Sequence, residues 1–259
     1  MSDRKKGLTG RPIILASSSP RRKQLLELAG VPFRAVPAGI DERPARKLGP
    51  LRLARWAAEA KARAVAPRFP ADIVLAADTV VALDGHAYGK PADLQQARQT
   101  LSALSGRTHI VYTAVAVLRG NGAQPLSGFS RTLVTMRELS PSVIGRYLAS
   151  GEAQDKAGAY AIQGEGRRLV RAIHGPYDNV VGMPMRLVLR LLRESGMTVP
   201  AINPDGAGHE ADSQSERSSK QGPFRTDAAG CGRARPRRLR PSGQFPTRDQ
   251  PELRRPGRA

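Results

Sequence analysis

Short, separate segments of this 259-residue chain carry side chains that suit the binding of a polyanion. In residues 16–22 an apolar run ends, serines follow, and a Ser-Pro pair starts a helix that carries Arg21 and Arg22. Backbone N–H groups at a helix start favour anions, the Ser17 hydroxyl adds a donor, and arginine adds bidentate charge. The segment therefore suits a phosphate cradle. A simple Ser-Pro helix cap with two exposed arginines explains the spacing equally well.

Acidic side chains in two further segments could supply the chemistry of hydrolysis. Asp41 and Glu42 stand in a loop before a predicted helix, and Asp78 stands at the C-terminal end of an apolar strand. Such strand ends face the crevice where α/β sheets bind ligands. Two separated carboxylates can hold Mg²⁺ or Mn²⁺, and one of them can take a proton from an attacking water. Taken singly, each acid is more readily a solvated loop residue or a helix cap.

Two lysines and a small-residue segment complete the candidate set. Lys90, between a glycine and a proline, sits on a rigid corner from which it can reach a phosphate as a point charge. Lys61 lies within a predicted helix, where a solvated face is the plainer interpretation. Residues 155–164 are small enough to let a ligand approach the backbone, and Gln163 can donate and accept hydrogen bonds toward a base. The plainer interpretation of that segment is a polar turn.

Alternating strands and helices must position these segments. The apolar periods and the Ser-Pro and Gly boundaries predict strands at 13–16, 73–77, 79–83, 108–118 and 131–136. They also predict helices that begin at residues 20, 51, 92, 141 and 184. This mixed order implies an α/β fold with helices packed on a sheet.

Composition limits the class of protein. Hydrophobic residues make up 40% and aromatic residues 4% of the chain, so the core must consist mostly of Leu, Val, Ile and Ala. No apolar stretch reaches the roughly 20 residues that span a bilayer, and the run after the basic start is too short for a signal-peptide core. We therefore expect a cytoplasmic protein without a membrane segment. Cys231 is the single cysteine, which excludes an internal disulfide, and the scattered histidines indicate turn or surface positions.

The chain changes character after about residue 200. Residues 201–259 are rich in Gly, Pro, Ser, Arg and Gln and have no apolar period. We expect a flexible start at 1–11, one folded domain at 12–200 and a disordered basic tail at 201–259. The basic run at 233–240 could form an RNA- or membrane-surface-binding arm, or the tail could be a non-functional extension. Acidic residues dilute the basic signal and favour the second interpretation.

The net charge of +20 raises the alternative of a non-enzymatic nucleic-acid-binding protein. Such a protein needs a clustered basic face with stacking aromatic residues. Here aromatic residues are few, and acids stand within the basic segments. Nucleic acid is therefore disfavoured as a partner, whereas a polyanionic small molecule would use the same cations.

In their order along the chain, these segments resemble the Maf family of nucleotide pyrophosphatases. The resemblance covers about residues 12–197 and includes residues 104–106, His109 and the segment 177–184. Each motif is weak by itself, but the ordered set is specific. It implies a fold similar to inosine triphosphate pyrophosphatases: an elongated mixed β-sheet with flanking helices, and two lobes around a cleft.

The resemblance also implies roles for individual residues. Asp78 resembles the family's catalytic proton acceptor, and Glu42 its partner at a divalent cation, Mg²⁺ or Mn²⁺. The expected reaction cuts a nucleoside triphosphate into a monophosphate and pyrophosphate. The residues that correspond to the triphosphate-binding set are Ser17, Arg22, Lys61 and Lys90.

Two branches of the family differ at positions that here are Arg21, Thr79 and Gln163. One branch prefers dTTP and UTP, the other 7-methyl-GTP, and this triplet resembles the dTTP/UTP branch. A regulatory role in cell division, historically attached to the family, is neither supported nor excluded by the residues. The oligomeric state also stays open, and a homodimer is one of the states to be considered.

Removal of the tail tests the predicted domain boundary. A chain that ends at Pro200 should keep its activity and its melting temperature, because residues 201–259 offer little apolar surface to pack on the domain. Activity assays and thermal melts of the two chain lengths check this expectation. A large loss of either property would show that the extension packs on the domain.

Overall fold

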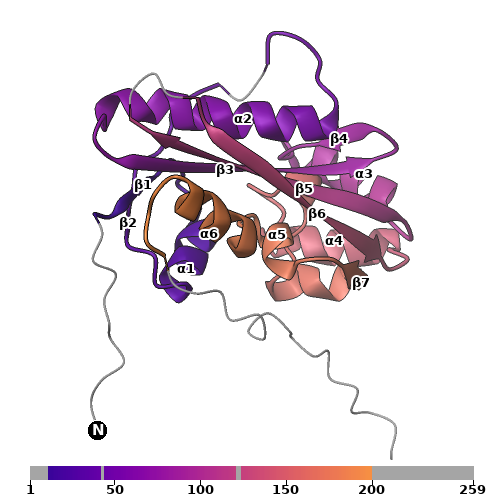
Figure 1. The fold of residues 1–259 in the computed structure, drawn as a ribbon. Coiled ribbons are helices and arrows are strands. Elements are labelled where there is room, and N and C mark those ends of the chain that lie inside the picture. Colours follow the sequence, from indigo (N-terminus) through magenta and orange to yellow (C-terminus); the bar gives the residue numbers. More distant parts are fainter. Residues whose placement is uncertain (1–10, 42–43, 121–123, 200–259) are drawn as a thin grey trace, which may run out of the picture. The chain divides into compact units, whose positions relative to one another are not determined.

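The computed structural model describes residues 11–41, 44–120 and 124–199 (Figure 1). The predicted tail at 201–259 and residues 1–10 of the predicted flexible start lie outside the described residues, as does the candidate Glu42. The domain bounds of 12–200 stay a prediction.

Strands and helices alternate along the described chain, as the sequence predicts. The strands are β1 (Ile13–Leu15), β2 (Phe33–Ala35), β3 (Ile73–Leu83), β4 (His86–Tyr88), β5 (Thr108–Arg119), β6 (Leu126–Met136) and β7 (Val170–His174). The α-helices are α1 (Pro20–Leu28), α2 (Pro50–Val65), α3 (Leu94–Leu104), α4 (Pro141–Ala149), α5 (Tyr177–Val181) and α6 (Met185–Glu194). Short 3₁₀ turns are η1 (Ala66–Arg68), η2 (Ala157–Ala159) and η3 (Gly164–Leu169).

The strands form one seven-stranded mixed sheet, which confirms the predicted α/β class. Its order is β2-β1-β3-β5-β6-β7, and β4 pairs with part of β3. The β1 strand runs parallel to β2 and β3, whereas the pairs among β3, β5, β6 and β7 are antiparallel. The long strands β3, β5 and β6 form the centre of the sheet (Figure 1).

The predicted strand boundaries are wrong for β3 and for β6. The sequence suggests a strand end at Asp78, but β3 continues through this residue because its ladder with β5 is unbroken, with Asp78 opposite Ala114. Likewise β6 begins at Leu126 rather than at residue 131, since its pairing with β5 extends to Val117. Strand pairing supplied by the neighbour overrides the local polar signal in both cases.

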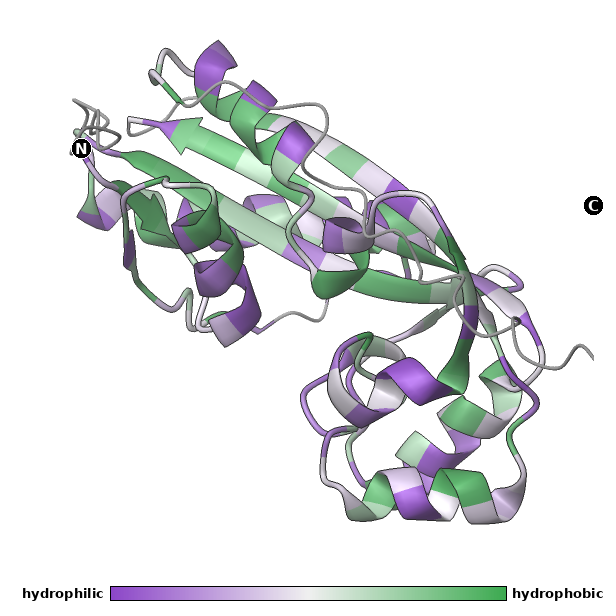
Figure 2. Ribbon diagram, turned by 90° about the horizontal axis from the view of Figure 1, so that it is seen from below, coloured by the Kyte–Doolittle hydropathy of each residue, from purple (hydrophilic) through white to green (hydrophobic). Residues whose placement is uncertain are grey.

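Apolar side chains pack in clusters toward the two ends of the long strands. At one end α2 covers one face of the sheet and α1 and α6 cover the other (Figure 1). At the other end α3, α4 and η2 pack around Val81 and Leu83. Figure 2 shows hydrophobic residues predominating in the long strands, while the helices alternate between hydrophobic and hydrophilic residues. These ends correspond to the two predicted lobes.

None of the helices in the described ranges is long and apolar enough to cross a membrane.

His109 is a core residue, so its interpretation as a turn or surface residue is wrong. Its side chain is 1% exposed, and its Nε2 lies 2.8 Å from the Tyr160 hydroxyl. Its Nδ1 has no hydrogen-bond partner among the described residues. Burial lowers the pKa of His109 from 6.5 to about 4, because the charged imidazolium would lose its hydration.

This burial predicts a pH dependence of stability. Between about pH 6.5 and 4 the unfolded chain protonates His109 and the folded chain does not, so the free energy of unfolding should fall as the pH decreases through this window. The full effect is about 3 kcal/mol. Urea melts from pH 4 to 7 of His109→Phe should show a flatter profile than the parent.

His86→Gln is the matched control, because His86 is exposed and should leave the profile unchanged. A parental slope in His109→Phe would mean that other groups carry the acid sensitivity.

Candidate active site

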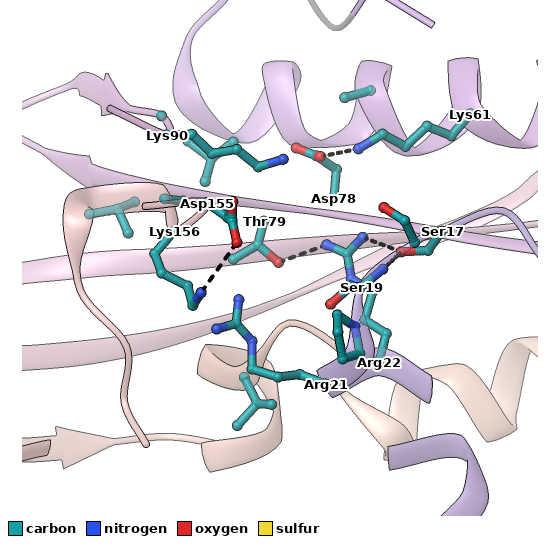
Figure 3. Close-up of a pocket in the computed structure, with 18 of the residues that line it drawn as sticks. Ser17, Ser19, Arg21, Arg22, Lys61, Asp78, Thr79, Lys90, Asp155 and Lys156 are labelled. Atoms are coloured by element: carbon teal, nitrogen blue, oxygen red, sulfur yellow. Dashed lines mark hydrogen bonds and ion pairs between the residues drawn. The ribbon is translucent and has the colours of Figure 1, made fainter. Parts of the chain in front are cut away.

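A cavity of about 1040 Å³ opens where one edge of β3 lacks a neighbouring strand. On this edge β1 pairs with β3 as far as Leu75, and β4 pairs with it from Val81 onward. Between them, residues 76–80 pair with β5 on the opposite edge, but no described strand pairs with them on this one. Asp78 and Thr79 lie in this gap and line the cavity (Figure 3).

A buried ion pair forms the base of the cavity. The Lys61 Nζ in α2 lies 2.7 Å from Asp78 Oδ1 in β3, with side-chain exposures of 9% and 11%. Helix α2 presents Lys61 toward the sheet, so the solvated-face interpretation is wrong. The ammonium compensates the carboxylate, because an unpaired charge at this depth would cost several kcal/mol. Asp78 thus faces the cavity as the expected catalytic acid would, but from the middle of a strand.

Arg22 extends from the first turn of α1 into the same space. Its Nε donates to the Gly182 carbonyl at 2.9 Å, its Nη1 to Ser17 Oγ at 3.3 Å and its Nη2 to Thr79 Oγ1 at 3.4 Å (Figure 3). Ser17 is buried, with 8% exposure, directly after β1. The predicted serine and arginine therefore contact each other at the edge of the cavity.

The start of α1 has the properties of an anion site. Ser19 occupies the N-cap position with Pro20 following, but the Ser19 side chain makes no capping hydrogen bond. The Ser19 amide instead donates to Ser17 Oγ at 3.2 Å. The helix start lines the cavity with its positive dipole end. Ser19 and Pro20 thus occupy the predicted cap positions, but without a side-chain capping hydrogen bond.

Arg21 and Arg22 point in different directions. Arg22 reaches toward Ser17 and Thr79, whereas Arg21 extends toward Lys156 (Figure 3). Burial lowers the pKa of Arg21, and the charge of Asp155 opposes that shift. Neighbouring helix residues project about 100° apart, so one turn supplies cations to two regions of the cavity.

The segment 155–164 closes the opposite side. The Gly158 amide donates to the Gly89 carbonyl at 3.1 Å, which joins this segment to the corner that carries Lys90. Gly158 has φ 73°, and a Cβ there would lie 2.8 Å from a Val81 methyl group, so glycine is required. Lys90 and Gln163 are exposed and line the cavity.

Lys156 is a candidate that the sequence reasoning did not select. It lines the cavity, its side chain is 18% exposed, and its Nζ lies 3.8 Å from Asp155 Oδ2. Burial, followed by the charge of Arg21, lowers the pKa of Lys156. Its place inside the small-residue segment was the available signal, but a lysine beside an aspartate is also typical of an ordinary turn.

The structure brings the predicted residues together around one cavity, apart from Glu42, which lies outside the described residues. Asp41, next to Glu42, also lines it. The predicted residues in the lining are Ser17, Arg21, Arg22, Lys61, Asp78, Thr79, Lys90 and Gln163.

The described side chains could hold a divalent cation only if a bound phosphorylated ligand supplied further oxygen atoms. Within residues 11–41, 44–120 and 124–199 no three His, Cys, Asp or Glu side chains gather as a metal site. Asp78 is a buried carboxylate on the cavity, and a cation such as Mg²⁺ typically takes one or two carboxylates together with phosphate oxygens and water. The described residues thus suit a cation that arrives with a phosphorylated substrate.

Comparisons with known proteins concern the described domain as a whole. A family model described as "Maf-like protein" matches residues 12–195. The dTTP/UTP pyrophosphatase of Deinococcus radiodurans is 48% identical over 186 residues, which cover 72% of this chain and 94% of the relative. That of Moorella thermoacetica is 47% identical over 187 residues, covering 72% and 96%.

Among solved structures, the Staphylococcus aureus Ham1 protein has a TM-score of 0.41 and 12% identity, covering 71% of this chain and 97% of that one. This likeness is too slight to bear on the fold. The family match over residues 12–195, and identities that extend over nearly the full length of the relatives, show that the chain belongs to the Maf-like protein family.

Proposed function

We propose that this protein is a nucleoside triphosphate pyrophosphatase that hydrolyses dTTP and UTP to the monophosphate and pyrophosphate. The observation that carries the proposal is a buried carboxylate, Asp78, in a cavity whose lining is otherwise rich in cations. Relatives that are 42–48% identical bear the name dTTP/UTP pyrophosphatase. The cations are Arg21, Arg22, Lys61, Lys90 and Lys156.

The reaction follows from the placement of these charges. A water attacks the α-phosphorus and gives its proton to the Asp78 carboxylate, while the bond from that phosphorus to the oxygen bridging to the β-phosphorus breaks. Pyrophosphate leaves with the bonding electrons, and Arg22 and the start of α1 stabilise its added charge. Lys61 keeps Asp78 oriented toward the cavity through the 2.7 Å ion pair.

The proposed cofactor is Mg²⁺ or Mn²⁺. Asp78 and, outside the described residues, Glu42 would hold it together with oxygens of the triphosphate. When bound, such a cation neutralises phosphate charge and favours ionisation of a coordinated water. No covalent nucleophile is needed, because Ser17 is engaged with the Ser19 amide and Arg22 and contacts no described base.

Base selection is proposed to involve Arg21 and Gln163, together with Thr79, whose hydroxyl accepts a hydrogen bond from Arg22. Arg21 extends toward Lys156, and Gln163 stands exposed in the lining (Figure 3). A glutamine amide can pair with the N3–H and the neighbouring carbonyl of uracil or thymine. Because its proposed substrates are free nucleotides, we propose that the protein acts in the cytoplasm and needs no nucleic acid or membrane as a partner. A homodimer stays a prediction.

Asp78→Asn tests the catalytic assignment. The amide cannot accept the proton of the water, so kcat for dTTP should fall by at least about a hundredfold. Pyrophosphate release measured on variants with a native circular dichroism spectrum checks this. The control is Asp84→Asn, because Asp84 follows the end of β3 in an exposed turn; this variant should turn over dTTP normally. Near-normal turnover in folded Asp78→Asn would reject Asp78 as the proton acceptor.

Substrate choice tests the assignment of Arg21, Thr79 and Gln163. We expect dTTP and UTP to be preferred over 7-methyl-GTP, and Gln163→Glu to narrow the difference. A lost hydrogen-bond pair to the base costs about 1–3 kcal/mol, or roughly tenfold to a hundredfold in kcat/KM. The measurement is kcat/KM for the three substrates. A preference of the parent for 7-methyl-GTP would keep the reaction but reverse the base assignment.

A further inference from the structure

The segment 177–184 contacts Arg22. The reaction proposed above gives this segment no role. It contains α5, which ends at Val181 and is followed by Gly182 as the C-cap in a left-handed conformation with φ 107°. The Gly182 carbonyl accepts a hydrogen bond from Arg22 Nε at 2.9 Å. A Cβ at residue 182 would lie 3.1 Å from Thr79 Oγ1 and 3.6 Å from Arg22 Nε. Glycine thus allows this backbone to approach the arginine closely.

A second route leads from Arg22 to the same helix through hydroxyl groups. Arg22 Nη2 donates to Thr79 Oγ1, which lies 2.9 Å from Thr113 Oγ1. Thr113 Oγ1 in turn donates to the Asn179 carbonyl at 2.8 Å. A hydroxyl has one hydrogen, so Thr113 must accept from Thr79, and Thr79 can only accept from Arg22. The direction of every hydrogen bond in this route is therefore fixed.

Asn179 anchors both routes to the sheet. Its Nδ2 donates to the Val111 carbonyl in β5 and to Thr132 Oγ1 in β6, both at 3.0 Å. Thr132 Oγ1 donates to the Pro176 carbonyl at 2.8 Å. Asn179, Thr113 and Thr132 are each 0% exposed. Asn179 Oδ1 is the one buried atom of this network without a partner among the described residues. A buried network of this kind favours a single arrangement, because each further unmade bond would leave another buried polar group unpaired.

We propose that Thr113 and Asn179 are positioning residues that hold the Arg22 guanidinium in place for the leaving pyrophosphate. This inference rests on the function proposed above and deepens it. An arginine fixed before the substrate arrives loses little freedom on binding, and its donors already point where charge develops. Without the Thr113 hydroxyl, Thr79 loses its acceptor and turns its hydrogen elsewhere. The Thr79 oxygen then no longer presents its lone pairs to Arg22 in one fixed direction, so the guanidinium is held less firmly.

Thr113→Val removes this hydroxyl and keeps the shape of the side chain. We expect the dissociation constant for pyrophosphate, measured by calorimetry with Mg²⁺, to rise about tenfold. Thr113→Ser restores the hydroxyl and should bind almost as the parent does. The control is Thr108→Val in the same strand, where Thr108 shares an exposed hydroxyl pair with Thr135. It should bind pyrophosphate normally.

Two readouts separate positioning from a general loss of structure. In the ligand-free protein the Nε–H of Arg22 should exchange with solvent faster in Thr113→Val than in the parent, as seen by NMR. In an Arg22→Ala background, Thr113→Val should cause no further loss of pyrophosphate affinity. An equal loss with and without Arg22, or unchanged Nε–H exchange, would overturn the inference.

The same experiments distinguish this inference from the proposed function. A parent protein that binds pyrophosphate and shows the expected effects of Thr113→Val, yet releases none from dTTP or UTP, would reject the function only. Normal hydrolysis with unaltered Arg22 in Thr113→Val would reject the positioning role only. A parent that does not bind pyrophosphate at all would reject both.

Discussion

The buried ion pair between Lys61 and Asp78 is the interaction on which the rest of the site depends. Asp78 occupies the middle of β3, within a run of buried residues, where an uncompensated carboxylate would cost several kcal/mol. Lys61 provides the opposite charge from α2 at 2.7 Å. The pair thereby couples the position of α2 on the sheet to the orientation of the acid, and removing either partner would disturb both.

The cavity itself results from an incomplete sheet edge. Because β1 ends at Leu15 and β4 pairs only from Val81, the central part of β3 stays accessible on one side. Three parts of the chain line this opening. They are the start of α1 after β1, helix α2 with Lys61, and the segment 155–164 on the far side. Cations from distant parts of the sequence thus line one cavity together with the buried acid Asp78. Charge gathered in this way suits a triphosphate far better than it suits an extended nucleic acid.

The geometry of α1 directs its two neighbouring arginines to different regions of this cavity. Successive positions on α1 send Arg22 toward Ser17 and Thr79 and send Arg21 toward Lys156. Arg22 is held by the Gly182 carbonyl and by hydroxyls that lead to Asn179. Arg21 has a lowered pKa from burial, with Asp155 nearby to compensate. A rigid cation for phosphate and a separate one for the nucleoside can therefore arise from neighbouring residues.

The sequence by itself determined the α/β class, most of the long elements and a set of candidate residues of which all but Glu42 line one cavity, because apolar periods, Ser-Pro helix starts and an ordered set of motifs are local signals. It could not determine that β3 runs through Asp78, that Lys61 is buried or that His109 belongs to the core, since pairing with β5 and packing against α2 and Tyr160 decide these points. Lys156 was missed because a lysine beside an aspartate is typical of an ordinary turn, and the Thr113–Asn179 network escaped because its members are far apart in the sequence. Partners such as these are distant in the sequence, and only the tertiary structure brings their charges and hydrogen bonds into contact.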